Sequence, residues 1–243
     1  QNFKTALEYG LTIFDDYKKQ LIALQKKFTI TADGAISFVY DSFFEPLDIL
    51  KKTLQEAELE NFFVIGFDIK AHSFYDQKKE LYLWRNKEFS SDALINFYQM
   101  LVEKYPVYSF ENALSWHDIQ GNKKLFESLG SSVQIASNDG FIHNATLLQG
   151  LHAERLVNAS IINSMEYSTI SELLEAILFA QSSGLNTIIK GSQSETEDTF
   201  LADLTVGTSS GQIQIGGGAH SQYMAKYNRM LLIEDFLATQ LLQ

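Results

Sequence analysis

The sequence contains no cysteine and almost no proline. Among its 243 residues there are 0 cysteines and 2 prolines. Without cysteine the chain cannot form a disulfide, bind a metal through thiolates or use a cysteine nucleophile. Pro46 stands just before a predicted helix at Leu47–Leu54, and Pro106 just before a predicted strand, so we expect neither proline to interrupt a regular element. No linker or low-complexity segment divides the chain, and we treat residues 1–243 as one domain.

Basic residues and long apolar runs are scarce as well. The chain has 19 lysines and arginines against 30 aspartates and glutamates, which gives a formal net charge of -11. This charge repels nucleic acid and anionic lipid, so we expect neither as a partner. No apolar run approaches the roughly 20 residues that a membrane-spanning helix needs. We therefore expect a cytoplasmic protein that does not act on a membrane.

From Phe62 onward, short apolar runs alternate with amphipathic stretches. This pattern is typical of a parallel sheet that is covered by helices. The predicted strands are Phe62–Ile69, Val107–Phe110, Val133–Ala136, Ser160–Ile162, Thr187–Ile189 and Gln212–Ile215. All but the first are about 25 residues apart, which fits one strand and one helix per unit. Six such units suit either an open doubly wound sheet or most of an eight-stranded barrel, and periodicity does not choose between them.

Periodicity and capping residues also predict helices. We expect them at Phe3–Lys26, from Ser91 through Leu101, at Ile170–Leu178 after the cap Thr169, and at Met224–Leu237 after Ser221. Gly184 stands after the helix predicted at Ile170–Leu178, at a position where that helix is expected to have ended. The first helix begins almost at the first residue, which predicts that this sequence starts inside a longer protein.

The C-terminal part carries a long motif. Residues 194–207 read SETEDTFLADLTVG and closely resemble the enolase segment SGETEDTFIADLAVG. Further pieces agree in order and spacing with the last strand, the final helix and two earlier strands of that family. They are Gly211–Ile213 with Gly216, Ala225–Arg229, Gly66–Ile69 and Tyr105–Glu111. On these motifs, which cover nearly the whole chain, the sequence is identified as a member of the enolase family.

The resemblance implies an α/β fold, namely an enolase-type TIM barrel of the form ββαα(βα)6. The six predicted strands would be the last six of the barrel, and Phe3–Lys26 would be an outer helix. The family's N-terminal capping domain and first two barrel strands would be absent, so that residues 1–243 form a partial C-terminal barrel domain. Six strands leave two open edges, and we expect residues outside this chain or a partner to cover them.

The resemblance also implies where a metal would bind. Enolases convert 2-phosphoglycerate to phosphoenolpyruvate with a lysine base, a glutamate and Mg²⁺ ions that are held by three carboxylates. The first two carboxylate positions fall on Asp68 and Glu111, and the third falls on Asn138 with Asp139 beside it. Acidic residues at strand ends are also commonly just solvated. We therefore expect at most a vestigial, weak Mg²⁺ site formed by Asp68, Glu111 and Asp139, and no other cofactor.

At the remaining catalytic positions that the resemblance implies, this sequence carries residues that cannot perform the family's chemistry. The catalytic lysine aligns with Asn163 and the second lysine with Gln214, and an amide supplies neither a basic lone pair nor positive charge. The acid of the GDEGG loop aligns with Asp33, which is one methylene shorter. The phosphate-binding His-Arg-Ser trio aligns with Gly191, Ser192 and Gln193, which lack a guanidinium group. Lys190, one place away, could compensate only in part.

A glycine run follows the last predicted strand. Gly216, Gly217 and Gly218 would suit a phosphate cradle before a helix. They equally suit a tight turn between strand and helix, which we regard as the plainer interpretation.

The losses predict a structural or scaffolding pseudoenzyme, since a fold does not carry its function with it. By resemblance to degraded enolase relatives in flagella and the cytoskeleton, we expect protein partners in a large cytoskeletal or axonemal assembly. We expect no homodimer of the family's usual kind, because an arginine of the last helix aligns with Leu232. Two alternatives stay open. One is an active glycolytic phosphopyruvate hydratase that uses Lys190 as its base; the other is a sensor that binds a phosphorylated acid through Asp68, Glu111 and Mg²⁺.

Overall fold

The computed structural model describes residues 2–137, 156–192 and 194–240. They form two compact units, each built from segments that are separated in the sequence. The first, which we call the sheet unit, comprises Val64–Lys190 and Thr208–Gln212. The second, the helical unit, comprises Gln1–Phe63, Gly191–Gly207 and Ile213–Gln243. Each unit is described by itself.

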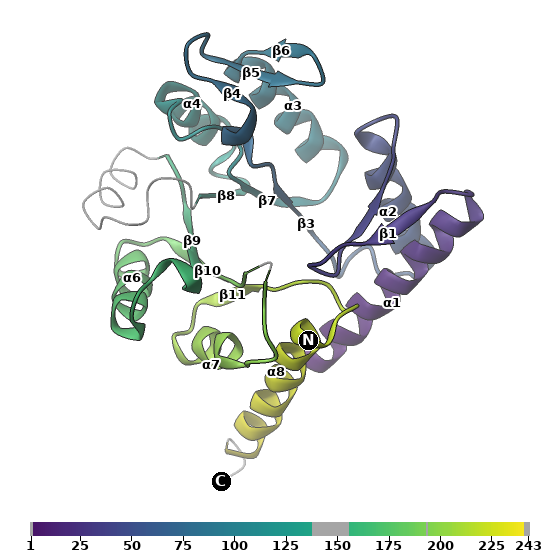
Figure 1. Ribbon diagram of the computed structural model, residues 1–243, viewed down its shortest axis with the longest axis vertical. Helices are drawn as coiled ribbons and strands as arrows, with labels where there is room; N and C mark the ends of the chain where they lie inside the picture. Colours follow the sequence, from purple (N-terminus) through teal and green to yellow (C-terminus); the bar gives the residue numbers. More distant parts are fainter. Residues whose placement is uncertain (1, 138–155, 193, 241–243) are drawn as a thin grey trace. The chain divides into compact units, whose positions relative to one another are not determined.

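The main sheet has six strands in the order β11-β10-β9-β8-β7-β3 (Figure 1). The strands are β3 (Ile65–Asp68), β7 (Val107–Glu111), β8 (Gln134–Ser137), β9 (Ala159–Asn163), β10 (Asn186–Lys190) and β11 (Gly211–Gln214). All six predicted strands are therefore confirmed, with small shifts at their ends. Each strand lies beside the next one of the six in the chain, whereas a doubly wound sheet would reverse its order at a switch point. Of the two architectures that the sequence left open, the strand order therefore favours the curled sheet of a partial barrel over an open doubly wound sheet. Strands β3 and β11 lie at its edges.

The first strand is shorter than expected at both ends. The sequence predicts Phe62–Ile69, but β3 begins at Ile65. The backbone N–H of Phe62 donates to the carbonyl of Leu59, 3.0 Å away, so the chain is still turning there. Apolar character alone does not separate such a turn from the strand that follows it.

Helices α3 (Ser91–Lys104), α4 (Ile119–Leu129) and α6 (Ile170–Ser182) connect the strands of the sheet unit. Figure 1 shows them along the outer side of the row of strands. The predicted caps are confirmed for α6, where the hydroxyl of Thr169 accepts from the N–H of Glu172 while Glu172 accepts from the N–H of Thr169. Gly184 follows the end of α6 with a φ of +77°, as a helix-terminating glycine does.

A small three-stranded sheet was not expected from the sequence. It consists of β4 (Tyr75–Asp76), β5 (Leu81–Trp84) and β6 (Lys87–Phe89), paired in chain order after the 3-10 turn Ala71–Phe74. Tyr82 of β5 is fully buried, and its hydroxyl donates to Asp118, which also caps α4. The strands are too short to show a period of two, so only tertiary contacts define them.

The helical unit contains α1 (Phe3–Ala23), α2 (Phe44–Glu56), α7 (Phe200–Gly207), α8 (Ser221–Gln240) and a hairpin of β1 (Phe28–Ile30) with β2 (Ile36–Phe38). Helix α1 packs against α2 and α8, and α7 packs against α8. Ile13, Leu54 and Leu59 form a buried apolar cluster in this unit. Among the described helices, none combines the length and the apolar character that crossing a membrane requires.

Helix α2 corrects the expectation for Pro46. The sequence places Pro46 just before the helix, but α2 begins at Phe44, so Pro46 lies in its first turn. A proline is tolerated there because the N–H groups of the first turn have no partner within the helix.

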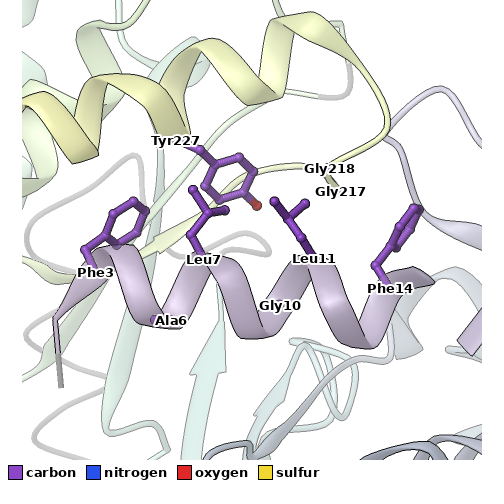
Figure 2. A pocket seen from close by; sticks show the side chains of 9 residues that line it. All are labelled: Phe3, Ala6, Leu7, Gly10, Leu11, Phe14, Gly217, Gly218 and Tyr227. Carbon is purple, nitrogen blue, oxygen red and sulfur yellow. The ribbon is translucent and has the colours of Figure 1, made fainter. Parts of the chain in front are cut away.

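Helix α1 also lines an apolar pocket in the helical unit, about 330 Å³ in volume. Figure 2 shows Phe3, Leu7, Leu11 and Phe14 on one face of α1, with Tyr227 of α8 opposite. The hydroxyl of Tyr227 already donates to the carbonyl of Gly216 over 2.8 Å. The pocket therefore presents mainly hydrocarbon surface.

Candidate functional site

Two carboxylates end neighbouring strands of the sheet unit. Asp68 is the last residue of β3 and Glu111 the last residue of β7, and the two are direct partners in the parallel register. Their side chains are 20% and 11% exposed. Because two partly buried like charges on adjacent strands repel each other, this arrangement needs a positive charge close by.

Lys190 supplies that charge. It is the last residue of β10, and its Nζ lies 3.2 Å from Oδ2 of Asp68 and 3.7 Å from Oε2 of Glu111. In the sheet order, β9 and β8 stand between β10 and the two acidic strands. The curl of the sheet thus brings a lysine from one side of the strand row to two carboxylates at the other. Lys70 is farther off, 3.9 Å from Oδ2 of Asp68, and largely exposed.

Asn112 holds Asp68 from the other side. Its Nδ2 donates to Oδ1 of Asp68 over 3.3 Å, and its Oδ1 accepts from the hydroxyl of Ser137 over 3.4 Å. The backbone N–H of Asn112 donates to the carbonyl of Ala136 at 2.9 Å, which places it between β7 and β8. Asn112 adopts a φ of +50°, a conformation that asparagine tolerates better than most residues. Sequence reasoning missed this residue; its place directly after Glu111 was the available signal.

Asn163, at the position of the family's catalytic lysine, is turned toward its own strand end. Its side-chain oxygen accepts from the N–H of Met165 at 3.1 Å, and its Nδ2 donates to Glu166 over 3.3 Å. These contacts cap the short 3-10 helix Ser164–Glu166. The amide is thus engaged locally. Asn138 and Asp139, the candidates for the third carboxylate position, lie outside the described residues.

The loop after β10 belongs to the helical unit and is organised by Glu195. One carboxylate oxygen of Glu195 accepts from the N–H of Ser192 over 2.5 Å, and the other lies 2.9 Å from Nζ of Lys226. A Cβ added to Gly191 would come within 2.9 Å of Glu195, so the glycine makes room for this acid. Gln193 lies outside the described residues. Acidic Glu195 thus binds the loop whose family counterpart binds phosphate.

Asp33 lies in the loop between β1 and β2. Its carboxylate accepts from the hydroxyl of Thr31, and its backbone carbonyl accepts from the N–H of Gly217 over 2.8 Å. A Cβ on Gly34 would stand 2.7 Å from the Gly217 carbonyl oxygen, and one on Gly216 would stand 2.3 Å from that of Asp33. The glycine run therefore allows backbone to pack on backbone, which supports the turn interpretation over a phosphate cradle.

Gln214, at the position of the second family lysine, also lies in the helical unit. Its backbone carbonyl accepts from the N–H of Gly191 at 2.9 Å. Its side-chain oxygen is buried and, within the part of the chain that the structure describes, has no hydrogen-bond partner. A neutral amide thus occupies a position where the family carries a positive charge.

The described residues of the sheet unit do not fit a Mg²⁺ centre. Mg²⁺ prefers about six oxygen ligands in octahedral geometry and binds no ammonium. Within residues 2–137, 156–192 and 194–240, no group of three or more histidine, aspartate or glutamate side chains could hold a metal ion. Asp68 and Glu111 instead face Lys190.

Comparison with known proteins decides the family. The chain matches the family model "Enolase, C-terminal TIM barrel domain" over residues 1–242. The chain belongs to the enolase family. It is 31% identical over 238 residues to a protein named "Enolase" from Corynebacterium kroppenstedtii (strain DSM 44385 / JCM 11950 / CIP 105744 / CCUG 35717). The match covers 97% of this chain and 56% of that relative, so the chain spans about half the length of the enolase it matches.

Membership of the enolase family confirms the fold that the motifs imply. It also identifies the carboxyl ends of the strands as the place of the candidate site, because catalytic groups of TIM barrels gather there. Here those ends carry Asp68, Glu111, Asn163 and Lys190. The ion pairs of Lys190 were missed from the sequence, where this lysine was considered as a partial substitute for the phosphate-binding arginine and as an alternative base. The signal that could have found them is a lysine that ends one strand of a sheet in which two other strands end in acids.

Proposed function

We propose that this enolase-family chain belongs to a non-catalytic protein that serves as a structural or scaffolding component of a larger assembly. The observation that carries the proposal is the bridge from Lys190 to Asp68 and Glu111. Among the described residues, Lys190 is the only lysine at the strand ends of the main sheet, and it is paired with two acids. By the resemblance, a cytoskeletal or axonemal assembly in the cytoplasm is the expected setting.

The chemistry of dehydration supports the proposal. Removing a weakly acidic proton needs a base within hydrogen-bond reach of it, and such a group typically contributes about 10²–10⁴-fold to the rate. The amide of Asn163 offers no basic lone pair and caps a turn. At the second lysine position, Gln214 brings no positive charge to a developing enolate. Both losses act on the same transition state.

An exposed apolar face on α8 supports a protein partner. Leu232 and Phe236, four residues apart on one side of the helix, are each 61% exposed. Exposed apolar side chains that lie next to each other can form part of a surface that another protein covers. The net charge of -11 favours a partner that presents basic residues around such a contact.

Fractionation of a native extract by size, followed by mass spectrometry, tests the scaffold role. We expect the protein to migrate with a defined large assembly, and a tagged Leu232→Ser/Phe236→Ser variant to leave it. The control is Leu178→Ser, which removes a 60% exposed leucine from α6. Migration of the wild-type protein as a free monomer or dimer would contradict the proposal.

A working phosphopyruvate hydratase is the second candidate. The observation that favours it is the 31% identity to a protein named "Enolase". It requires Lys190 to act as the base, although its Nζ faces two carboxylates. Turnover of 2-phosphoglycerate that Lys190→Ala abolishes and Lys70→Ala leaves intact would establish this alternative. We expect no turnover in any of the three proteins.

A further inference from the structure

The charged side chains at the carboxyl ends of β3, β7 and β10 meet at Lys190. Asp68 and Glu111 bring two negative charges, and Lys190 brings one positive charge that lies within 4 Å of both. Nζ of Lys70 lies 3.9 Å from Oδ2 of Asp68, with a side chain that is 59% exposed. A lysine ammonium carries three donors and no acceptor, so a single group can serve two carboxylates at once.

We propose that the ammonium of Lys190 takes the place of a divalent cation between Asp68 and Glu111, so that this enolase-family site is closed to Mg²⁺ by a cation of the chain itself. The inference concerns metal binding alone and does not rest on the scaffold role. It assigns Lys190 a positioning role, because the lysine neutralises two acids on neighbouring strands and keeps them at the strand ends without a metal.

Geometry argues against lysine and metal binding there together. A Mg²⁺ ion bound by both acids would lie about 2 Å from an oxygen of each. The ammonium is 3.2 Å from one of those carboxylates and 3.7 Å from the other, so ion and ammonium would compete for the same oxygens and repel each other. The amide of Asn112 occupies the remaining oxygen of Asp68 at 3.3 Å. The sensor of a phosphorylated acid through Mg²⁺ is disfavoured for the same reason.

Removing the lysine should open the site. In Lys190→Met, two adjacent carboxylates lose their counter-charge, and such a pair favours a divalent cation. We expect the variant to bind Mg²⁺ and Mn²⁺ at least about tenfold more tightly than the wild-type chain, because the competing cation is gone. Its melting temperature should be lower than that of the wild type in EDTA and should rise when Mg²⁺ is added, since a ligand of the native state stabilises it.

The experiment uses the full chain in four forms: wild type, Lys190→Met, Lys70→Met and Lys190→Met/Asp68→Asn. Each is titrated with Mg²⁺ and with Mn²⁺ by calorimetry and is melted in EDTA, in Mg²⁺ and in NaCl of equal ionic strength. Only Lys190→Met should gain tight binding and a Mg²⁺-dependent rise in melting temperature. Lys70→Met should behave as the wild type, and the double variant should lose the gain because one of the two carboxylates is missing.

Two results would overturn the proposal. One is tight Mg²⁺ binding by the wild-type chain that Lys190→Met does not improve, which would mean that the lysine does not exclude the metal. The other is a folded Lys190→Met that binds no Mg²⁺, as the wild type does, which would mean that the two acids form no metal site. If Lys190→Met does not fold, Mn²⁺ binding to Lys190→Gln and to the wild type, followed by electron paramagnetic resonance, gives the same comparison. Neither readout depends on partners or turnover, so failure here and failure of the scaffold proposal are distinguishable.

Discussion

Lys226 is the most deeply buried charge among the described residues. Its side chain is 0% exposed, and its Nζ lies 2.9 Å from Glu195 and donates to the carbonyls of Thr196 and Gln222. Burying two charges stabilises a fold only modestly, but removing one partner leaves the other uncompensated in a poorly solvated place. The pair therefore matters more for holding the loop after β10 than for net stability.

Substituting Lys226 tests that role. We predict that Lys226→Met lowers the free energy of unfolding by about 3–5 kcal/mol. The control is Lys124→Met, which breaks an exposed pair with Asp92 and should change the free energy of unfolding far less. Urea unfolding measures both. Equal losses in the two variants would contradict the account, and partial recovery in Lys226→Met/Glu195→Gln would support it.

The pair of Asp203 and Arg229 gives a dependence on pH. Two nitrogens of Arg229 donate to the carboxylate of Asp203, and these hydrogen bonds lower the pKa of Asp203 below its ordinary value. A lowered pKa in the folded state means that the stabilisation is complete above the unfolded pKa of about 3.9 and is lost as the pH falls through the folded value.

Arg229→Gln should therefore lower the stability of the folded chain at neutral pH but not in acid. Both side chains are 41% exposed, so solvent screens the pair and we expect only a small loss of stability near neutral pH. The difference from the wild type should shrink below about pH 4 as Asp203 takes up a proton in both proteins. Urea unfolding across this pH range measures it. A difference that grows toward acid would refute the assignment.

At the scale of elements, the capping box of α6 illustrates what the sequence predicts well. Thr169 and Glu172 act within one turn, so local chemistry is sufficient to place the helix start. We predict that Thr169→Ala costs about 1 kcal/mol of stability. Ser171→Ala, two residues farther along on the exposed side, should be nearly neutral. Thermal unfolding of the two variants measures the contrast, and similar losses would show that the cap is not what stabilises α6.

Two glycines of the helical unit should respond in opposite directions to alanine. At Gly34, a φ of +77° and the carbonyl of Gly217 leave no room for a Cβ, so Gly34→Ala should destabilise the chain. Gly10 lies inside α1 with nothing within 4 Å of an added Cβ. Gly10→Ala should therefore stabilise the chain by up to about 1 kcal/mol, because glycine is a poor helix former. Melting temperatures give both signs; a fall for Gly10→Ala would contradict the open environment.

The elements that the sequence does not predict share a physical cause. Strands such as β9 and β10 of the main sheet carry runs of buried apolar residues, so the sequence pattern reveals them. Strand β4 has two residues and β6 has three, and their pairing depends on contacts such as that of Tyr82 with Asp118. Such strands have too few residues for a period to emerge. The family motifs place the sheet, but they do not place these additions.

At the scale of the whole molecule, the sequence identifies the residues of the site but not their grouping. The motifs place Asp68, Glu111 and Asn163 at strand ends, as the structure does. The reach of Lys190 to the two acids depends on the curl of a sheet in which β9 and β8 intervene. No local pattern encodes that distance, because it is set by the accumulated twist of all the strands between them.

In the proposed function, this enolase-family site performs no dehydration, because Lys190 neutralises its two carboxylates and its base position holds an amide. The most direct measurement is conversion of 2-phosphoglycerate to phosphoenolpyruvate by the protein purified from its native source, with millimolar Mg²⁺ and an authentic enolase as positive control. The account predicts a rate equal to that of the blank at every Mg²⁺ concentration. A Mg²⁺-dependent rate that Asp68→Asn abolishes would contradict it.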